Sequence, residues 1–594
     1  DVMLERVALL RARGQDDVAL QTASRTLQLV AGSHWPVQQI YAHMAISDLT
    51  LPDYVQAEAH LLAAQRLANT VMLPHARYRL HQRLGHVRRL QGRDEEAREL
   101  LQAATDEIER LRGTLAHEAL RTSFLADKAG AYEELIQLHL AAGDEDGIQQ
   151  AFTVAERAKS RALVDLLAGV GDVGSGVADA EMTARLRTIR TDLNAIYNQL
   201  LGHLSEYDRQ EHSPELQTRA SELEQEWSRL RLQIAATSVA EPDLWSPSPS
   251  LEAIQAHLPP FPLLAYHVVG DEIVAFVRVA ERLLVARQIS TPATIRQLLQ
   301  RLEVQWARFR AGRTFVERHA ETLERSVQRV LAALYTELFA PLESLLDEVL
   351  PARTPSPRRL AIVPHGLLHH VPFHALHDGR HYLLERYEVS YAPSATVLSL
   401  CQRRSRRRVG PALLFGVTDP AIPAVEREVY AVGRHVHDAE VWLNEEATSA
   451  RLQSAAPGCS VLHMACHGLF RADNPMFSAL KLHDGWLTAA DALQLDLAGA
   501  LVTLSACESG RGKVLGGDEI LGLTRSFLGA GATTIVVSLW LAQDETTANL
   551  MAEWYRRLQQ TSDRASALRA AQLAIKEHYP HPYYWAPFVL VGQR

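Results

Sequence analysis

The chain has 594 residues, of which 47% are hydrophobic and 22% charged, and it carries a net charge of −9 at neutral pH. This length predicts two to four domains, each long enough to bury a hydrophobic core. The mild negative charge argues against a general nucleic-acid binder, and four cysteines without even spacing argue against a disulfide scaffold. Because no apolar run is long enough to cross a bilayer, and the cysteine pattern fits a reducing compartment, we expect a cytoplasmic protein.

Residues 1–168 carry apolar side chains at helical spacing, with breaks at Gly14, Asp53, Gly92 and Gly143. The breaks are separated by two steps of 39 residues and one of 51, and each precedes an Ala-rich segment. Small residues on the second helix of a hairpin allow neighbouring helices to stack closely. The pattern predicts a solenoid of paired helices similar to divergent tetratricopeptide (TPR) repeats, with an irregular helical bundle as the alternative.

Residues 169–240 form the next predicted domain. A glycine-rich stretch at 168–179 ends the repeats, and amphipathic residues over about 180–237 predict an antiparallel helical hairpin. We expect this hairpin to act as a spacer or an interaction arm. The Pro- and Ser-rich stretch 241–250 marks a further boundary, after which the hydrophobic period changes.

From residue 251 onward, short β-rich runs alternate with helical patterns. We divide this part into a β-rich and then helical segment, 251–350, and a core, 351–594. Continuous apolar strands separated by helices predict a largely parallel sheet that is covered on both faces. In such sheets the working site lies at the carboxyl ends of the strands, so the motifs at those ends are the candidates for chemistry.

Two of the predicted strands end in reactive residues. The first, "SVLHMACHG", delivers His467 and then Gly468, and the second, "ALVTLSACESG", delivers Cys507 40 residues later. This separation accommodates one helix with its loops, so the strands can be parallel neighbours with both residues at one edge. An imidazole near a thiol lowers the thiol pKa and can protonate a leaving amine, which suffices for acyl transfer. The backbone N–H groups of Gly468 and Cys507 are candidates for an oxyanion hole.

Other groupings of histidine and cysteine are less favoured. Successive strand residues point to opposite faces, so Cys466 diverges from His467 and is expected to pack in the core. The same alternation argues against a zinc site built from this pair with His463 and Cys507. The histidines within 365–377 are expected in the core or on the surface. We therefore expect no metal or organic cofactor, and no third, orienting carboxylate is evident from spacing alone.

The motifs "LHMACHG", "LVTLSACESGRG", "LGLTRSFLGAGATTIVVSLWLAQDETT" and "WAPFVLVG", in this order, resemble the CHAT family of caspase-like cysteine peptidases related to separase. The stretch "LAIVPHGLLHHVPFHALHDGRHYLL" resembles the first core segment of that family, and "AFTVAERAKSRALVDLLA" resembles the repeat that precedes it. The resemblance implies an all-α TPR-like region followed by an α/β caspase-like domain with a mostly parallel central sheet.

The resemblance also implies roles for individual residues. It assigns His467 as base and acid and Cys507 as nucleophile, in agreement with the strand-end argument. It places Asp544, in the loop after the "LW" strand, in a specificity pocket for a basic side chain before the scissile bond. The alternative role of Asp544 is the N-cap of the following helix, and Asp518 and Glu519 are competing acids.

The resulting prediction is a cysteine endopeptidase that cleaves a protein substrate after a basic residue. The repeats would bind an activator, a substrate or a partner subunit, because stacked helix pairs expose an extended concave surface. Bacterial relatives in the family often serve in regulated defence or signalling, where proteolysis awaits a trigger. The alternative is an adaptor with a silent peptidase fold that acts through protein–protein interaction. We expect neither membrane binding nor direct nucleic-acid binding.

Overall fold

The computed structural model describes the chain apart from residues 1, 33–34, 52, 72, 114–127, 160–162, 164–179, 203–212, 238–250, 350–356, 405–408, 421, 472–473, 509–517 and 541. The glycine-rich stretch 168–179 and the Pro- and Ser-rich stretch 241–250 lie outside the described residues. The chain divides into two compact units, residues 1–158 with 241–245, and residues 159–240 with 246–594. We call the first the helical unit and the second the sheet unit.

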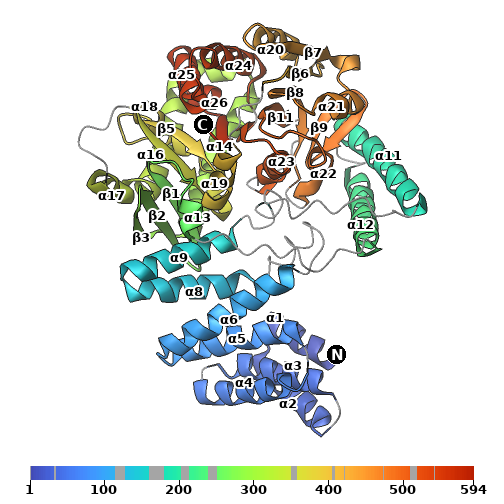
Figure 1. Ribbon diagram of the computed structural model, residues 1–594, viewed down its shortest axis with the longest axis vertical. Helices are drawn as coiled ribbons and strands as arrows, with labels where there is room; N and C mark the ends of the chain where they lie inside the picture. Colours follow the sequence, from blue (N-terminus) through green and yellow to red (C-terminus); the bar gives the residue numbers. More distant parts are fainter. Residues whose placement is uncertain are drawn as a thin grey trace. The chain divides into compact units, whose positions relative to one another are not determined.

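The helical unit consists of helices that pair in chain order (Figure 1). They are α1 (Val2–Ala12), α2 (Asp16–Val30), α3 (Pro36–Leu49), α4 (Tyr54–Ala68), α5 (Pro74–Leu90), α6 (Asp94–Gly113), α8 (Ala129–Ala142) and α9 (Glu145–Ala158). Gly14, Gly92 and Gly143 turn the chain within their pairs with φ values of 70°, 74° and 73°, which residues with a Cβ rarely adopt. Between α3 and α4 the Asp53 side chain caps the first turn of α4. All four breaks read from the sequence are therefore turns of helical hairpins.

Small side chains lie where neighbouring helices of this unit contact. On α4, Ala57, Ala64 and Ala68 are buried in one cluster with apolar side chains of α3 and α5. On α5, Gly85 approaches α6 so closely that a Cβ there would lie 2.8 Å from Leu101 Cγ. These contacts give the close stacking of helix pairs that a solenoid requires.

The sheet unit is built on a sheet of 13 strands within the described part of the chain. The strands are β1 (Leu263–Val269), β2 (Glu272–Val279), β3 (Arg282–Ser290), β4 (Arg358–Val363), β5 (Tyr387–Tyr391), β6 (Ala412–Gly416), β7 (Ala439–Leu443), β8 (Val461–Leu469), β9 (Ala479–Leu482), β10 (Gly485–Thr488), β11 (Leu501–Glu508), β12 (Thr534–Ser538) and β13 (Phe588–Gly592). Their order is β10-β9-β8-β11-β12-β13-β5-β4-β1-β2-β3, and β6 pairs with both β8 and β7. The pairs β6–β8, β8–β11 and β11–β12 are parallel, whereas β8 pairs with β9 in antiparallel fashion. The predicted fold class, helices followed by an α/β domain with a mostly parallel central sheet, is confirmed.

Helices and short 3-10 turns pack around this sheet (Figure 1). The helices are α11 (Ala180–Gly202), α12 (Ser213–Thr237), α13 (Leu251–Gln255), α14 (Pro292–Ala307), α15 (Arg313–Arg318), α16 (Ala320–Leu338), α17 (Ala340–Val349), α18 (Leu383–Arg386), α19 (Ala395–Arg403), α20 (Val425–Gly433), α21 (Ser449–Ala455), α22 (Ala489–Ala492), α23 (Asp518–Gly529), α24 (Asp544–Leu558), α25 (Arg564–His578) and α26 (Pro582–Trp585). The 3-10 turns are η1 (Arg308–Ala311), η2 (Gly366–His370), η3 (Phe373–Ala375), η4 (Asn444–Glu446) and η5 (Pro475–Phe477). Among the helices the structure describes, none combines the length and the apolar character needed to cross a membrane.

The β-rich segment before residue 350 joins the same sheet as the later strands. Strand β1 runs parallel to β4, with Leu263 opposite Ala361, and β2 and β3 extend the sheet in antiparallel fashion. The Tyr266 hydroxyl donates a hydrogen bond of 2.9 Å to the Leu338 carbonyl of α16. One hydrophobic core therefore includes residues from both sides of the 350–356 gap.

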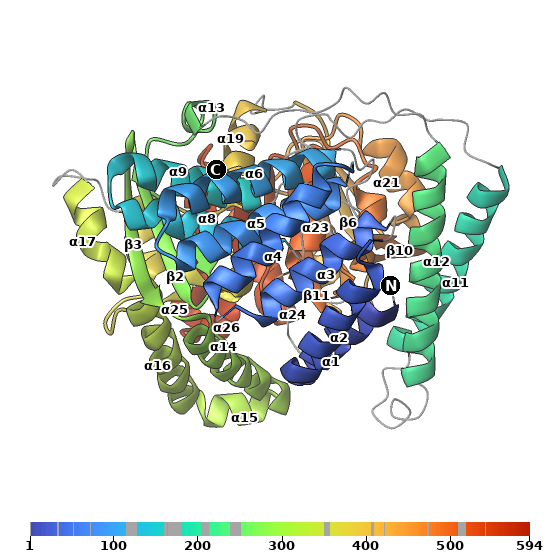
Figure 2. The ribbon, with the colours of Figure 1, turned by 90° about the horizontal axis from the view of Figure 1, so that it is seen from below.

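The predicted helical hairpin is present as α11 and α12, which run side by side (Figure 2). Its apolar face packs on the region of β9 and β10. This packing gives the hairpin a fixed place on the sheet unit, beside the strand that carries His467.

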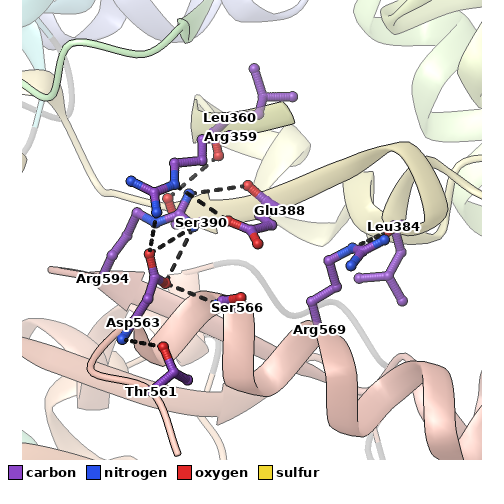
Figure 3. A network of polar contacts seen from close by, with 10 residues as sticks. All are labelled: Arg359, Leu360, Leu384, Glu388, Ser390, Thr561, Asp563, Ser566, Arg569 and Arg594. Carbon is purple, nitrogen blue, oxygen red and sulfur yellow. Dashed lines mark hydrogen bonds and ion pairs between the residues drawn. The ribbon is translucent and has the colours of Figure 1, made fainter. Parts of the chain in front are cut away.

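A network of polar contacts joins β4 and β5 to Arg594, two residues after β13, and to Asp563, the N-cap of α25 (Figure 3). The guanidinium of Arg594 contacts the Glu388 carboxylate and lies 3.2 Å from the Asp563 carboxylate. Arg359 of β4 reaches the same two carboxylates at 3.5 and 3.3 Å. Arg594 is 8% exposed whereas Arg359 is 54% exposed, so the buried charge balance rests on Arg594.

Candidate active site

Parallel pairing of β8 and β11 brings together the two site residues predicted from separate motifs. Cys507 is the register partner of His467, and the pairing is continuous from Leu501 opposite Val461 to this point. Neighbouring strands lie about 4.8 Å apart, and register partners in a parallel pair share one face of the sheet. The backbones of His467 and Cys507 are therefore adjacent at the carboxyl ends of two central strands.

The imidazole of His467 is held by a carboxylate from a third strand end. His467 is buried, with 11% of its side chain exposed, and its Nε2 contacts Oδ2 of Asp419. Asp419 follows β6, which pairs in parallel with β8, and its Oδ1 accepts the N–H of Ile422 at 3.3 Å. A carboxylate at Nε2 keeps the proton on that nitrogen and leaves Nδ1 as the basic one.

The other imidazole nitrogen is available as a base. Nδ1 of His467 is buried and has no hydrogen-bond partner among the residues the structure describes. A buried nitrogen whose lone pair accepts no hydrogen bond lowers the stability of the fold, and such atoms are therefore candidates for a functional role. The arrangement of an oriented, buried imidazole next to a cysteine-bearing strand is the one that general-base chemistry requires.

Asp419 is a site residue that reasoning from spacing missed. The strand-end rule that selected His467 and Cys507 applies equally to "PALLFGVTDP", in which a predicted strand is followed by a polar turn. Asp419 is the first acidic residue after that strand. The rule therefore makes Asp419 a candidate site residue, although its contact with His467 depends on the pairing of β6 with β8.

A second histidine–carboxylate pair lies on the same face of β8. Nε2 of His463 is 3.1 Å from Oε1 of Glu428 on α20, and both side chains are fully buried. The ring of Tyr555 on α24 packs edge-on against His463, and its hydroxyl is 2.7 Å from that of Thr503. These contacts fix α20 and α24 on the face that carries His467.

The structure accounts for the other cysteine and histidine candidates by packing. Cys466 is 2% exposed and belongs to the main hydrophobic core, as strand alternation predicts. His374, within the 365–377 cluster, is buried and bonded to Tyr391 and to the Ala586 carbonyl. Within the described ranges, no group of three or more His, Cys, Asp or Glu side chains is arranged to hold a metal ion.

Asp544 is the first residue of α24 and is not its cap. The N-cap is Gln543, whose side chain accepts a backbone N–H from the first turn, so the N-cap alternative for Asp544 is wrong. Instead, Oδ2 of Asp544 accepts the N–H of Ala424 at 2.7 Å. Burial raises the pKa of the Asp544 carboxyl, and the carboxylates of Glu428 and Asp419 act in the same direction. Asp544 therefore lies near the His467–Asp419 pair.

Gly468 lies at the end of the β8 ladder. It pairs in register with Glu508 of β11 and with Leu480 of β9. A Cβ at this position would lie 2.8 Å from the Phe470 ring, so a larger residue here would require that ring to move.

The two competing acids, Asp518 and Glu519, are the first residues of α23. Acidic residues are favoured in the first turn of a helix because its N-terminus carries a partial positive charge. Their position is thus explained by the helix itself.

Comparison with known proteins places a family domain over this site. Residues 328–593 match the family model described as the CHAT domain. The chain is 27% identical over 325 residues to tetratricopeptide repeat protein 28 of Homo sapiens, an alignment that covers 44% of this chain and 13% of that protein. The chain thus spans about an eighth of the length of the curated relative it matches.

Two groups of solved structures are similar to the chain at low identity. The Saccharomyces cerevisiae separase–securin complex has 10% identity and a TM-score of 0.41, covering 100% of this chain and 53% of that chain. The Arg-specific cysteine proteinase gingipain R has 11% identity and a TM-score of 0.30, covering 51% of this chain and 75% of that chain.

Proposed function

We propose that this chain, whose residues 328–593 match the CHAT domain model and follow TPR-like helices in the sequence, is a cysteine endopeptidase. In this proposal Cys507 is the nucleophile and His467 the general base and acid. The observation that supports it most strongly is the register of β8 and β11, in which Cys507 is the partner of His467.

The proposed reaction follows from the two nitrogens of His467. The Cys507 thiol gives its proton to Nδ1, and the thiolate attacks the scissile carbonyl carbon. The protonated imidazole, stabilised by Asp419 at Nε2, then gives the proton to the leaving amine as the peptide C–N bond breaks. Water, activated by the same imidazole, hydrolyses the thioester and restores the thiol. The N–H groups of Gly468 and Cys507 are the proposed donors to the oxyanion.

The charge around the site supports cleavage after a basic residue. Asp419, Glu428 and Asp544 are close enough for the first two to raise the Asp544 pKa. Clustered carboxylates favour a cation, so we assign Asp544 to the pocket for an Arg or Lys side chain. Asp518 and Glu519 are the weaker candidates for this pocket.

The repeats provide the proposed means of control. Stacked helix pairs expose an extended surface, and we assign it to a protein activator, a substrate or a partner subunit. On the cysteine pattern we place the enzyme in the cytoplasm, where the Cys507 thiol stays reduced.

The second candidate function is a silent adaptor. It is favoured by the curated relative, whose name describes repeats and no peptidase activity. In that case the helical unit would carry the function, and the His467–Cys507 register would be an inactive remnant.

Labelling with an Arg-directed chloromethyl ketone separates the two candidates. We expect an adduct on Cys507 in the full chain, lost in His467→Ala and retained in Cys466→Ser, as found by mass spectrometry of peptides. An adduct that never forms on Cys507, with the chain alone or with added cell extract, contradicts the peptidase and leaves the adaptor.

A further inference from the structure

A buried ion pair ties the exit of β8 to the helical hairpin. Arg471, shortly after His467, donates from Nη1 to Oε1 of Glu224 on α12 at 2.5 Å and from Nη2 to Oε2 at 3.1 Å. The side chains are 16% and 3% exposed. Glu224 also accepts a 2.7 Å hydrogen bond from the Tyr197 hydroxyl of α11, so both helices of the hairpin meet at this carboxylate.

Apolar contacts surround this pair. Trp227 of α12 packs edge-on against Phe477, with ring centroids 5.2 Å apart. Asn194 of α11 accepts the N–H of Trp486 at 3.2 Å. The buried members of the interface are Ile189, Leu193, Ile196, Tyr197, Ala220, Leu223, Phe477, Ala479 and Trp486. The buried members of this interface that do not belong to the hairpin all lie within 477–486, the stretch that follows the His467 strand.

The segment held by Glu224 is the one that shapes the end of β8. The main-chain N–H of Arg471 donates to Ser478 Oγ at 3.1 Å, which closes the loop between β8 and β9. From there β9 returns along β8 and pairs Leu480 with Gly468. The backbone of Gly468, a proposed oxyanion donor, is thus paired on one side with the strand that follows this loop.

The same segment also contacts the elements that follow Cys507. Turn η5 packs on α23, where a Cβ at Gly522 would lie 2.5 Å from the Pro475 carbonyl oxygen. Helix α23 is the next helix after the strand that carries Cys507. The loop fixed by Glu224 therefore leads into β9, which follows the His467 strand, and contacts α23, which follows the Cys507 strand.

We propose that Glu224 is a positioning residue for the peptidase site, an inference that rests on the proposed function. Through Arg471 it holds the loop after His467, so the docked hairpin α11–α12 sets the geometry of the oxyanion side of the site. Removing one partner of a buried pair leaves the other charge uncompensated, which drives Arg471 toward water and frees the loop.

Three variants of the full chain test this role. Glu224→Gln removes the charge and keeps the shape, Glu224→Asp keeps the charge on a shorter side chain, and Glu222→Gln is the control. Glu222 lies on the same helix, is 59% exposed and pairs only with nearby Arg219 among the described residues. The measurements are kcat and KM on an Arg-containing peptide, and deuterium exchange of residues 469–482.

For Glu224→Gln we expect kcat to fall by about 10- to 100-fold with KM changed by less than about threefold, because the loop positions the reacting groups. Exchange over 469–482 should rise in this variant and not in Glu222→Gln. Glu224→Asp should lower kcat less, and it carries the test if Glu224→Gln does not fold. Wild-type kcat or unchanged exchange in a folded Glu224→Gln overturns the positioning role and leaves the peptidase standing. A wild-type chain that never labels on Cys507 overturns the proposed function and this role with it.

Discussion

Asp544 and Ala424 are joined by a 2.7 Å hydrogen bond across 120 residues of sequence, from the Ala424 N–H to the carboxylate. Ala424 occupies the N-cap position of α20, and the loop before it carries Asp419, the acid that contacts His467. The residue assigned to the specificity pocket therefore also holds the loop that orients the proposed base. These two roles predict different responses to substitution.

Asp544→Asn keeps an oxygen that can accept the Ala424 N–H and loses the charge. We expect its kcat/KM to fall by about 10- to 100-fold for substrates with Arg before the cut, while substrates with neutral residues there change little. Asp544→Ala should lower kcat/KM for both kinds of substrate, because it also removes the hydrogen bond that holds the loop before Ala424. A peptide-library assay that finds the same basic preference in Asp544→Asn contradicts the pocket assignment.

Asp419→Asn is expected to lower kcat by about 100-fold or more, because the amide no longer fixes the tautomer or stabilises the imidazolium of His467. Glu426→Gln, an exposed position on α20, is the matched control and should leave kcat unchanged. Steady-state kinetics on both variants decide the matter. Equal activity of the two would mean that the contact with Asp419 is structural only.

Acid should destabilise the sheet unit through His374. Burial lowers the pKa of His374 to about 4, below the ordinary value of 6.5, so the unfolded chain binds the proton more readily. Stability is therefore full above pH 6.5 and is lost as the pH falls toward 4, by about 3 kcal/mol for this group. Urea unfolding at several pH values measures the free energy of unfolding. We expect this free energy to fall less steeply with decreasing pH in His374→Gln than in the wild type. Burial lowers the pKa in the same direction at His365, His369, His370 and His581. If the free energy of unfolding depends on pH in the same way in His374→Gln and in the wild type, His374 is not the source of the acid sensitivity.

The network in Figure 3 predicts unequal effects for two arginines. Arg594→Met leaves the carboxylates of Glu388 and Asp563 buried with too little positive charge, which should cost about 3–5 kcal/mol. Arg359→Met removes a half-exposed partner of the same carboxylates and should cost about 1 kcal/mol or less. The free energy of unfolding in urea measures both. Equal losses of unfolding free energy would show that the two arginines contribute equally to the neutralisation of these carboxylates.

Two helical glycines should respond to alanine with opposite signs. A Cβ at Gly522 would lie 2.5 Å from the Pro475 carbonyl oxygen, so Gly522→Ala should cost about 1–3 kcal/mol. At Gly433, the last residue of α20, the nearest atom would be 3.4 Å away, and alanine should stabilise the helix by up to about 1 kcal/mol. Thermal unfolding of the two variants provides the comparison, and a stable Gly522→Ala would mean that η5 can move away from α23.

The features that could be read from the sequence are those set by local chemistry. Gly14, Gly92 and Gly143 mark turns because few other residues adopt a positive φ, and Asp53 marks one because it caps the next helix. The central strands could be predicted because each is a local run of apolar residues. Short strands such as β9 and β10 were missed because four residues carry too little periodicity.

The parts of the site that escaped prediction depend on long-range pairing. Asp419 meets His467 only because β6 lies beside β8, an order that spacing does not reveal. The cap of α24 was misplaced by one residue, since Gln543 and Asp544 can both cap and the choice is made by the distant Ala424 N–H. Arg471 and Glu224 are likewise unremarkable until the hairpin is placed on the sheet.

The pairing of β1 with β4 has a practical consequence for expression. The CHAT match begins at residue 328, inside α16, yet the sheet already includes three strands upstream of that point. A fragment that starts there would leave the edge of β4 that pairs with β1 without its partner strand, beside the apolar side chains of Leu360 and Ile362. Open, apolar strand edges recruit other chains, so such a fragment should aggregate on synthesis, whereas one that begins before β1 should stay monodisperse.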